Sequence, residues 1–256
     1  MRIHAYAPAR VDLAGGTLDI WPLYLFHPGA LTVHLAVTRY AHCVVEPRRD
    51  KRVVLVSRDS GVREPFASLR ALHRKPRYRL PLLAHLVSHF APRHGLTLTT
   101  WSESPAGAGL GGSSALGIAV CAALTRSCRA KIRPVEWIAL VRDVEARILS
   151  VPTGEQDHYP AVFGGVAALH LEPGRVWREP LRVNLKELES RLLLVYTGKP
   201  RRSGVNNWRV FKNHLEGNRR LRLNFAELAD VSMRMREALL RGDWRGLGRL
   251  LRREWQ

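Results

Sequence analysis

Cysteine is scarce in this chain of 256 residues, which contains only Cys43, Cys121 and Cys128. An odd and sparse set of thiols gives no disulfide framework and no paired metal-ligand spacing, so we expect all three to be core residues in a reducing compartment. The first residues lack the apolar core of a signal peptide, and no run of about 18 apolar residues is present to span a membrane. These absences favour a cytoplasmic protein.

Acidic residues are also few, because 22 Asp and Glu stand against 41 Lys and Arg, which gives a formal net charge of +19. Residues 191–256 hold 16 of the basic residues and only 6 of the acidic ones. This excess predicts attraction to polyanions, and it leaves nucleic acid, an anionic membrane and phosphorylated small molecules open. An apolar content of 46% is ordinary for a globular chain and excludes whole-chain disorder, collagen and coiled coil.

The apolar pattern predicts strands and helices that do not alternate regularly along the chain. The expected strands are residues 2–7, 10–14, 31–45, 53–57, 96–101, 163–171 and 192–196, the first four in an antiparallel meander. The expected helices are residues 80–93, a segment from Ser114 to Thr125, and residues 134–149, 206–221, 224–240 and 243–255. Asn224 is expected to cap the helix that Gly242 ends. This order favours an α+β fold, and Pro173-Gly174 marks a boundary between domains of residues 1–172 and 173–256.

Residues 105–115, with the sequence PAGAGLGGSSA, lie between an expected strand and an expected helix. Glycines let the backbone pass close to a bulky anion, and the free N–H groups of a first helical turn point at such an anion. The hydroxyls of Ser113 and Ser114 can bond phosphate oxygens or hold a divalent metal. The segment lacks the Gly-Lys-Ser/Thr of a Walker loop and the βαβ setting of a dinucleotide-binding loop. It predicts a phosphate-binding loop, with a flexible turn before a helix as the alternative.

Four segments occur in an order that resembles the GHMP kinases, a superfamily that includes galactokinase, homoserine kinase, mevalonate kinase and phosphomevalonate kinase. They are APARVDLAGGTLD at residues 7–19, the glycine-rich loop, Glu145 in a helix, and GEQDHYPAVFGG at residues 154–165. The GGTLD and QDH variants, with YTGKPRRS at residues 196–203, are similar to sugar kinases that resemble D-glycero-D-manno-heptose 7-phosphate kinase, with fucokinase-like domains nearby. The resemblance covers essentially the whole chain.

The resemblance implies the two-domain α+β fold of the superfamily. The N-terminal domain would be like domain 2 of ribosomal protein S5, and the C-terminal domain would be ferredoxin-like. The implied activity is transfer of the γ-phosphoryl group of ATP to a hydroxyl group of a sugar or sugar phosphate, with ATP and Mg²⁺ as cofactors. Positioning and charge neutralisation do most of the work in such a transfer.

The same resemblance implies roles for single residues. Asp157 would accept or orient the proton of the attacking hydroxyl, and Arg10 would contact the reacting phosphate or stabilise that carboxylate. Without the resemblance, Asp157 reads as a turn aspartate and Arg10 as a surface arginine. Ser114 and Glu145 would be the Mg²⁺ ligands. The residues expected to bind ATP phosphates are Gly107, Gly109, Leu110, Gly111, Gly112, Ser113 and Ser114. Those expected to bind the acceptor are Thr17, Asp19, Gly165, Lys199, Arg201, Arg202 and Ser203, the last four as a turn that can hold a substrate phosphate.

The superfamily's second glycine-rich motif, of the GAGGGG kind, has no counterpart between residues 198 and 256, so we expect an incomplete C-terminal domain. Three explanations stay open: a fragment, a domain completed by a partner chain or a second copy, and a non-catalytic pseudokinase that binds a nucleotide or sugar. Nucleic-acid binding rests only on the charge and is less favoured, because no zinc spacing, RNA motif or basic tail is present. The sequence does not specify the sugar, the hydroxyl group or the oligomeric state.

Overall fold

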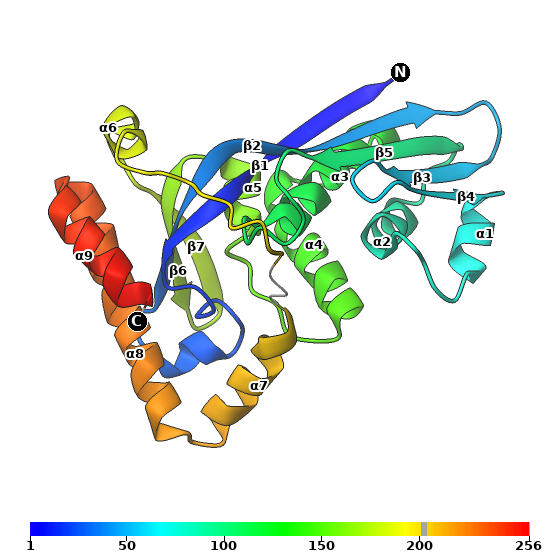
Figure 1. Cartoon of the computed structure of the whole chain (residues 1–256). Coiled ribbons are helices and arrows are strands. Elements are labelled where there is room, and N and C mark those ends of the chain that lie inside the picture. Colours follow the sequence, from blue (N-terminus) through cyan, green and yellow to red (C-terminus); the bar gives the residue numbers. More distant parts are fainter. Residues whose placement is uncertain (201–203, 256) are drawn as a thin grey trace.

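The computed structural model describes residues 1–200 and 204–255 and shows a mixed sheet covered by helices (Figure 1). The strands are β1 (Ile3–Ala14), β2 (Leu31–Pro47), β3 (Val53–Ser57), β4 (Val62–Phe66), β5 (Leu96–Ser102), β6 (Val166–Glu172) and β7 (Arg175–Pro180). The helices are α1 (Leu69–Arg74), α2 (Pro81–Phe90), α3 (Gly112–Cys128), α4 (Pro134–Leu149), α5 (His158–Phe163), α6 (Leu185–Glu189), α7 (Gly204–Leu215), α8 (Arg219–Arg241) and α9 (Trp244–Trp255), with a short 3-10 helix η1 (Leu23–Phe26).

Strand β2 organises the sheet because it is long enough to pair with three other strands. β1 runs antiparallel along one of its edges. On the other edge, β5 pairs with residues 41–47 and β6 with residues 31–35. The order is β4-β3-β5-β2-β6-β7, with β1 paired to β2, and the β3–β5 pair is parallel while the other pairs are antiparallel.

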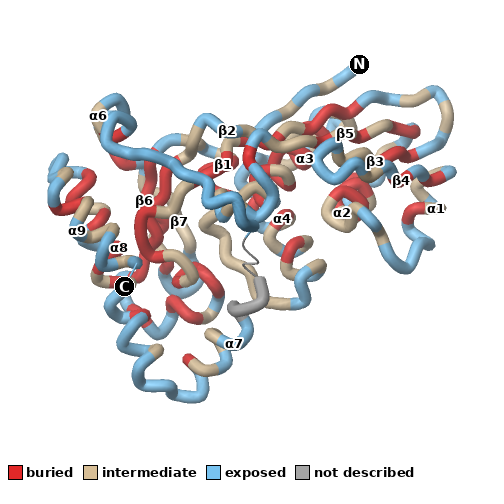
Figure 2. Tube along the Cα trace, in the orientation of Figure 1, coloured by how far each residue is buried: buried red, intermediate tan, exposed pale blue. Residues whose placement is uncertain are grey.

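Helices bury the two halves of this sheet separately. In the first half, α2, α3 and α4 pack on β2, β3 and β5 through residues such as Leu55, Leu98 and Leu124. In the second half, α8 and α9 pack on β1, β2 and β6 through residues such as Val33 and Met235. Figure 2 shows the buried stretches along the sheet and on the helix sides that face it. The start of α5 contacts β1 where these two halves meet, and this is where the candidate site lies.

The α+β fold predicted from the sequence is confirmed. Pro134 begins α4 at its first turn, and Gly242 ends α8 in the left-handed conformation, as expected. All three cysteines are free, and Cys43 and Cys121 are fully buried while Cys128 is partly buried. No helix among the described residues has the length and apolar character that a membrane span requires.

Several predicted elements were wrong in detail, because contacts with other elements of the fold determine where strands and helices begin and end as much as the local apolar pattern does. Residues 2–7 and 10–14 form the single strand β1, which passes Pro8 with a register shift. The expected meander is broken because β5 lies between β2 and β3. Residues 158–163 form α5, so β6 begins only at Val166. The cap of α8 is Asn218, which accepts from Leu221 N, and Asn224 lies inside the helix. Elements η1, β4, α1, β7 and α6 were not predicted.

The expected buried strand at residues 192–196 is also wrong. This segment is coil, and its apolar side chains are exposed, with Leu193 at 88%. The compact apolar run indicated burial, but a strand also needs a neighbour, and no strand pairs with it among the described residues. Beyond residue 180 the described residues form helices and coil. Pro173-Gly174 lies in the turn between β6 and β7, and the division into two domains at this point stays a prediction.

Candidate active site

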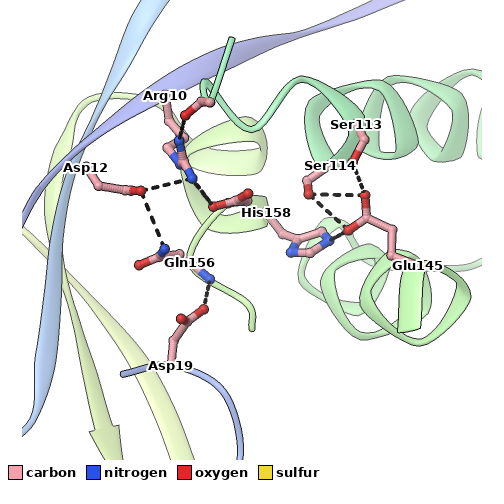
Figure 3. A network of polar contacts seen from close by, with 10 residues as sticks. Arg10, Asp12, Asp19, Ser113, Ser114, Glu145, Gln156 and His158 are labelled. Carbon is pink, nitrogen blue, oxygen red and sulfur yellow. Dashed lines mark hydrogen bonds and ion pairs between the residues drawn. The ribbon is translucent and has the colours of Figure 1, made fainter. Parts of the chain in front are cut away.

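Arg10 on β1 is at the centre of the site (Figure 3). Its guanidinium donates to Asp157 Oδ1 from Nε at 2.9 Å and from Nη2 at 2.5 Å. Nη2 also lies 2.9 Å from Asp12 Oδ2, and only 7% of Arg10 is exposed. Burial lowers the pKa of Arg10, but the charges of Asp157 and Asp12 outweigh it and raise the pKa above its ordinary value. The site therefore holds a fixed guanidinium between two carboxylates.

The glycine-rich loop is fastened to the same arginine. Arg10 Nη1 donates to the carbonyl of Gly109 at 2.6 Å, and the Arg10 backbone N–H donates to the carbonyl of Leu110 at 3.0 Å. Gly111 has a φ of +64° and packs so closely on Arg10 and Asp157 that an added Cβ would crowd both. Only glycine combines this conformation with this approach, so the loop is held directly beside the Arg10–Asp157 pair.

The loop leads straight into helix α3, as the sequence indicated. Gly107 and Gly109 also have positive φ, and Gly111 is the N-cap of α3. The helical ladder begins where Ala115 N donates to Gly111 O, so the N–H groups just before it belong to the first turn. An anion placed there meets these donors and the positive end of the helix dipole. The residues expected to bind phosphate, 107 and 109–114, thus lie in one loop and the first turn of α3.

Glu145 on α4 reaches across to the start of α3. Ser113 Oγ donates to Glu145 Oε1, and Ser114 Oγ lies 3.0 Å from Glu145 Oε2. His158 Nε2 lies 3.0 Å from the same Oε2. Burial raises the pKa of Glu145, but the His158 and serine contacts outweigh it and hold the pKa below its ordinary value. The buried carboxylate therefore stays charged, beside two hydroxyls and an imidazole.

His158 lies against the Glu145 carboxylate. Only 1% of this residue is exposed, and it is the first residue of α5. Burial lowers the pKa of His158, but the Glu145 carboxylate raises it to a net value above the ordinary one. Asp157 immediately precedes it as the N-cap of α5 rather than the start of a strand, which sends the two side chains to different partners.

Asp19 lies beneath the segment that carries Asp157. Its Oδ2 accepts from the backbone N–H of Gln156 at 2.8 Å, and a Cβ on Gly154 would collide with the same carboxylate. Burial raises the pKa of Asp19 to about 6. Thr17, two residues earlier, has a φ of +78° in the turn that follows β1. The turn after β1 and the loop before α5 are therefore locked together.

Asp12 belongs to the site but was not singled out from the sequence. It contacts Arg10 Nη2, and Gln156 Nε2 donates to its Oδ2 at 3.4 Å. Burial raises the pKa of Asp12 to about 7, although the charge of Arg10 acts in the opposite direction. The sequence does contain a signal for Asp12. It lies two residues after Arg10 on an expected strand, and residues two apart on a strand point to the same face.

We expect the free energy of unfolding to fall as pH rises from about 4 to about 7 because of Asp12. The carboxyl has a pKa of about 7 in the folded chain and an ordinary value of 3.8, so the folded state retains a proton here that the unfolded state has lost. In an Asp12→Asn variant, the free energy of unfolding is expected to depend less on pH over this range. Chemical denaturation between pH 4 and pH 8 measures it, with exposed Asp143→Asn as control. Parallel curves for the wild type and Asp12→Asn would contradict the assignment.

A cavity of about 240 Å³ opens beside Ser113 and Glu145. Its walls are mainly apolar, and they come from the start of α2, from α3 and from the end of α4. The lining residues are Ser57, Arg79, Leu80, Pro81, Leu82, Leu83, Thr100, Ser113, Leu116, Glu145, Ile148 and Leu149. No local pattern predicts this cavity, because it is assembled from helix ends that are distant in the chain.

The remaining predicted residues are less closely gathered. Gly165, with a φ of +72°, lies just before β6 near Arg178. Lys199 is exposed in the coil after α6, and Arg201, Arg202 and Ser203 lie outside the described residues. No cluster of three or more His, Cys, Asp or Glu side chains arranged for a metal ion occurs in the part of the chain that the structure describes. Any metal at Ser114 and Glu145 would need further ligands from a substrate.

The sequence of this chain is similar to those of known kinases. Residues 78–165 match the family described as "GHMP kinases N terminal domain". The D-glycero-alpha-D-manno-heptose 7-phosphate kinase of Campylobacter jejuni is 28% identical over 261 residues, which cover 99% of this chain and 76% of that protein. The L-fucokinase/L-fucose-1-P guanylyltransferase of Bacteroides fragilis is 28% identical over 98% of this chain, but this covers only 29% of that longer protein.

A solved structure gives the same picture of the fold. The D-glycero-D-manno-heptose 1-phosphate kinase described from "Bacteriodes thetaiotaomicron" superposes with a TM-score of 0.81 at 23% identity, over 100% of this chain and 78% of that one. At this identity the likeness establishes the fold, while substrate and mechanism depend on the residues of this chain.

Proposed function

The chain carries a GHMP kinase N-terminal domain at residues 78–165 within the GHMP kinase fold, and from this premise we propose that it is an ATP-dependent kinase acting on a hydroxyl group of a sugar or sugar phosphate. The observation that carries the proposal is the Arg10–Asp157 pair beside the glycine-rich loop. A carboxylate, a guanidinium and a phosphate-binding helix start are the groups that in-line phosphoryl transfer needs within one site. The comparisons give no support to the pseudokinase or nucleic-acid alternatives.

Asp157 would receive the acceptor hydroxyl. Both hydrogen bonds from Arg10 end on Oδ1, so Oδ2 stays available, and 30% of the side chain is exposed. Asp157 Oδ2 would accept the hydroxyl proton as the hydroxyl oxygen attacks the γ-phosphorus of ATP, and the bond from that phosphorus to the bridging oxygen would break to release ADP. Arg10 would fix the carboxylate in this orientation and place a positive charge where the transferred phosphoryl group develops negative charge.

The nucleotide would lie along α3. Residues 107–114 would bind its phosphates through backbone N–H groups, and the apolar cavity beside Ser113 would receive the adenine base. The order of these parts is consistent with a γ-phosphoryl group that points toward Arg10. Asp19 would accept hydroxyl groups of the sugar next to the loop that carries Asp157.

The residues present fit Mg²⁺, which prefers oxygen ligands and keeps several waters. Ser114 Oγ and the charged Glu145 carboxylate are adjacent and buried, and both offer hard oxygen atoms. They would hold the ion, which would neutralise phosphate charge when bound. Ser113 and His158 would hold the Glu145 carboxylate in place through its two oxygens.

The test is ATP turnover by the purified chain with a panel of acceptors. D-glycero-D-manno-heptose 7-phosphate and 1-phosphate come first because of the relatives found, followed by unphosphorylated heptose, L-fucose and galactose. We expect ADP release that depends on one of these acceptors and on Mg²⁺. Phosphate on the acceptor, detected by mass spectrometry, separates transfer from simple ATP hydrolysis. A full-length, folded preparation that transfers phosphate to no acceptor would contradict the proposal.

A further inference from the structure

Arg178 on β7 is a partly buried arginine that no carboxylate neutralises. Its Nη2 donates to the carbonyl of Gly164 at 2.8 Å, and its guanidinium carbon lies 5.4 Å from the centroid of the Phe163 ring. Burial alone lowers its pKa, because no acidic side chain in the described ranges 1–200 and 204–255 is near enough to raise it. A cation taken out of water usually has an anionic partner.

The guanidinium also has an unused donor. Arg178 Nε is buried and has no acceptor among the described residues. Glu179, its neighbour along β7, cannot serve because alternate residues of a strand point to opposite faces. The Glu179 carboxylate instead accepts two bonds of 2.6 Å from Arg236 and lies 2.7 Å from His170 Nε2. Arg178 therefore carries a charge without an acidic partner and a buried donor without an acceptor among the described residues.

Arg178 lies at the edge of the proposed active site. Gly164, which it contacts, and Gly165 end the segment that begins with Gly154 and carries Asp157, and a Cβ on Gly165 would lie 3.6 Å from Arg178 Nη2. His34, fully buried on β2, is within electrostatic reach of Arg178, Arg10 and Asp157. Burial, followed by the charges of the two arginines, lowers the pKa of His34 to about 3, so this imidazole is neutral. Arg178 and the Arg10–Asp157 pair thus act on the same imidazole.

We propose that Arg178 binds a phosphate group that the acceptor already carries, so that the substrate is a sugar phosphate rather than a free sugar. A phosphate monoester supplies oxygen atoms for several donors of one guanidinium fork and cancels its charge. The position of Asp157 gives the direction of binding. Asp157 beside Arg10 is the group proposed to receive the acceptor hydroxyl, so the hydroxyl end of the acceptor belongs there and its phosphate end belongs at Arg178 beside Gly164.

This inference rests on the proposed kinase function, and the experiment separates the two. Arg178→Gln and Arg178→Lys are compared with the wild type, using D-glycero-D-manno-heptose 7-phosphate and the unphosphorylated heptose as acceptors. Arg178→Gln is expected to raise KM for the sugar phosphate about tenfold or more and to leave KM for the free sugar and for ATP within about twofold. Arg178→Lys keeps the charge but loses the planar guanidinium fork. Its KM for the sugar phosphate is expected to lie between those of the wild type and Arg178→Gln.

Arg175→Gln is the matched control, because Arg175 is exposed on the same strand and lies over Trp177. It is expected to change neither KM. If Arg178→Gln raised KM equally for the phosphorylated and the free acceptor, or raised KM for ATP instead, the assignment would be overturned. Melting curves without ligand establish that the variants fold.

If no acceptor is phosphorylated, that result counts against the proposed kinase function alone. A binding measurement still tests whether Arg178 binds the acceptor phosphate. Heptose 7-phosphate is expected to raise the melting temperature of the wild type and of Arg175→Gln but not of Arg178→Gln. Inorganic phosphate, tested separately, is expected to do the same more weakly. The absence of stabilisation in the wild type, or equal stabilisation in Arg178→Gln, would overturn it.

Discussion

Replacing Asp157 with Asn is expected to lower kcat by about 10²–10⁴-fold, the range that general-base catalysis contributes. The amide has the shape of the carboxylate but cannot take the proton of the acceptor hydroxyl. Because Arg10 holds Oδ1 through two hydrogen bonds, the variant keeps an oxygen for the guanidinium and should fold. KM for ATP is expected to change little, since the glycine-rich loop is hydrogen-bonded to Arg10 rather than to the Asp157 carboxylate.

Steady-state kinetics of acceptor phosphorylation measure this effect. Asp143→Asn is the control, because the side chain of Asp143 on α4 is 67% exposed and pairs with Arg142. A kcat for Asp157→Asn within a few-fold of the wild type would remove Asp157 from the catalytic role. The site would then act by positioning alone.

Replacing Arg10 with Gln is expected to abolish most activity and to lower the free energy of unfolding by about 3–5 kcal/mol. The loss is large because two carboxylates, Asp12 and Asp157, lose their cation in a buried setting, and the loop carbonyl of Gly109 loses its donor. The destabilisation should be smaller near pH 5 than near pH 8. Burial already raises the pKa of Asp12 to about 7, so at acidic pH its carboxyl is protonated and needs no partner.

Denaturant unfolding at the two pH values measures the change. Arg2→Gln is the matched control, since Arg2 lies just before the same strand, has 67% of its side chain exposed and pairs with Glu46 at 3.4 Å. The double variant Arg10→Gln with Asp12→Asn is expected to regain part of the lost stability, because one unpaired carboxylate has been removed. Equal losses at both pH values would contradict the role given to Asp12.

The local parts of the site could be predicted from the sequence because neighbouring residues determine them. Four glycines and two serines before an alanine-rich helix require a tight loop at a helix start, and the structure has positive φ at Gly107, Gly109 and Gly111. The GHMP resemblance likewise picked out Arg10, Asp19, Glu145 and Asp157, which the fold brings into one region. Their catalytic and binding roles stay predictions.

Other features depend on pairing and burial, which no local pattern contains. Asp12 becomes part of the site because the turn after β1 folds against the loop before α5. Residues 192–196 have the composition of a buried strand but lie exposed, because strand formation depends on a neighbour as much as on apolar side chains. Proline at position 8 suggested a break, yet β1 continues through it because β2 pairs on both sides of the register shift.

The sequence by itself determined the fold class, the glycine-rich loop at a helix start and the identity of the charged groups, since these follow from residue type and short-range spacing. Only the tertiary structure decided which of those charges meet. Arg10 and Asp157 are 147 positions apart and share a hydrogen bond because β1 and the start of α5 pack on each other. The same packing places Arg178 beside Gly164 with no acidic side chain near it among residues 1–200 and 204–255, and this makes one residue of the arginine excess a specific position to test. The sequence specifies only the net charge, whereas the structure shows whether an individual buried charge has a partner.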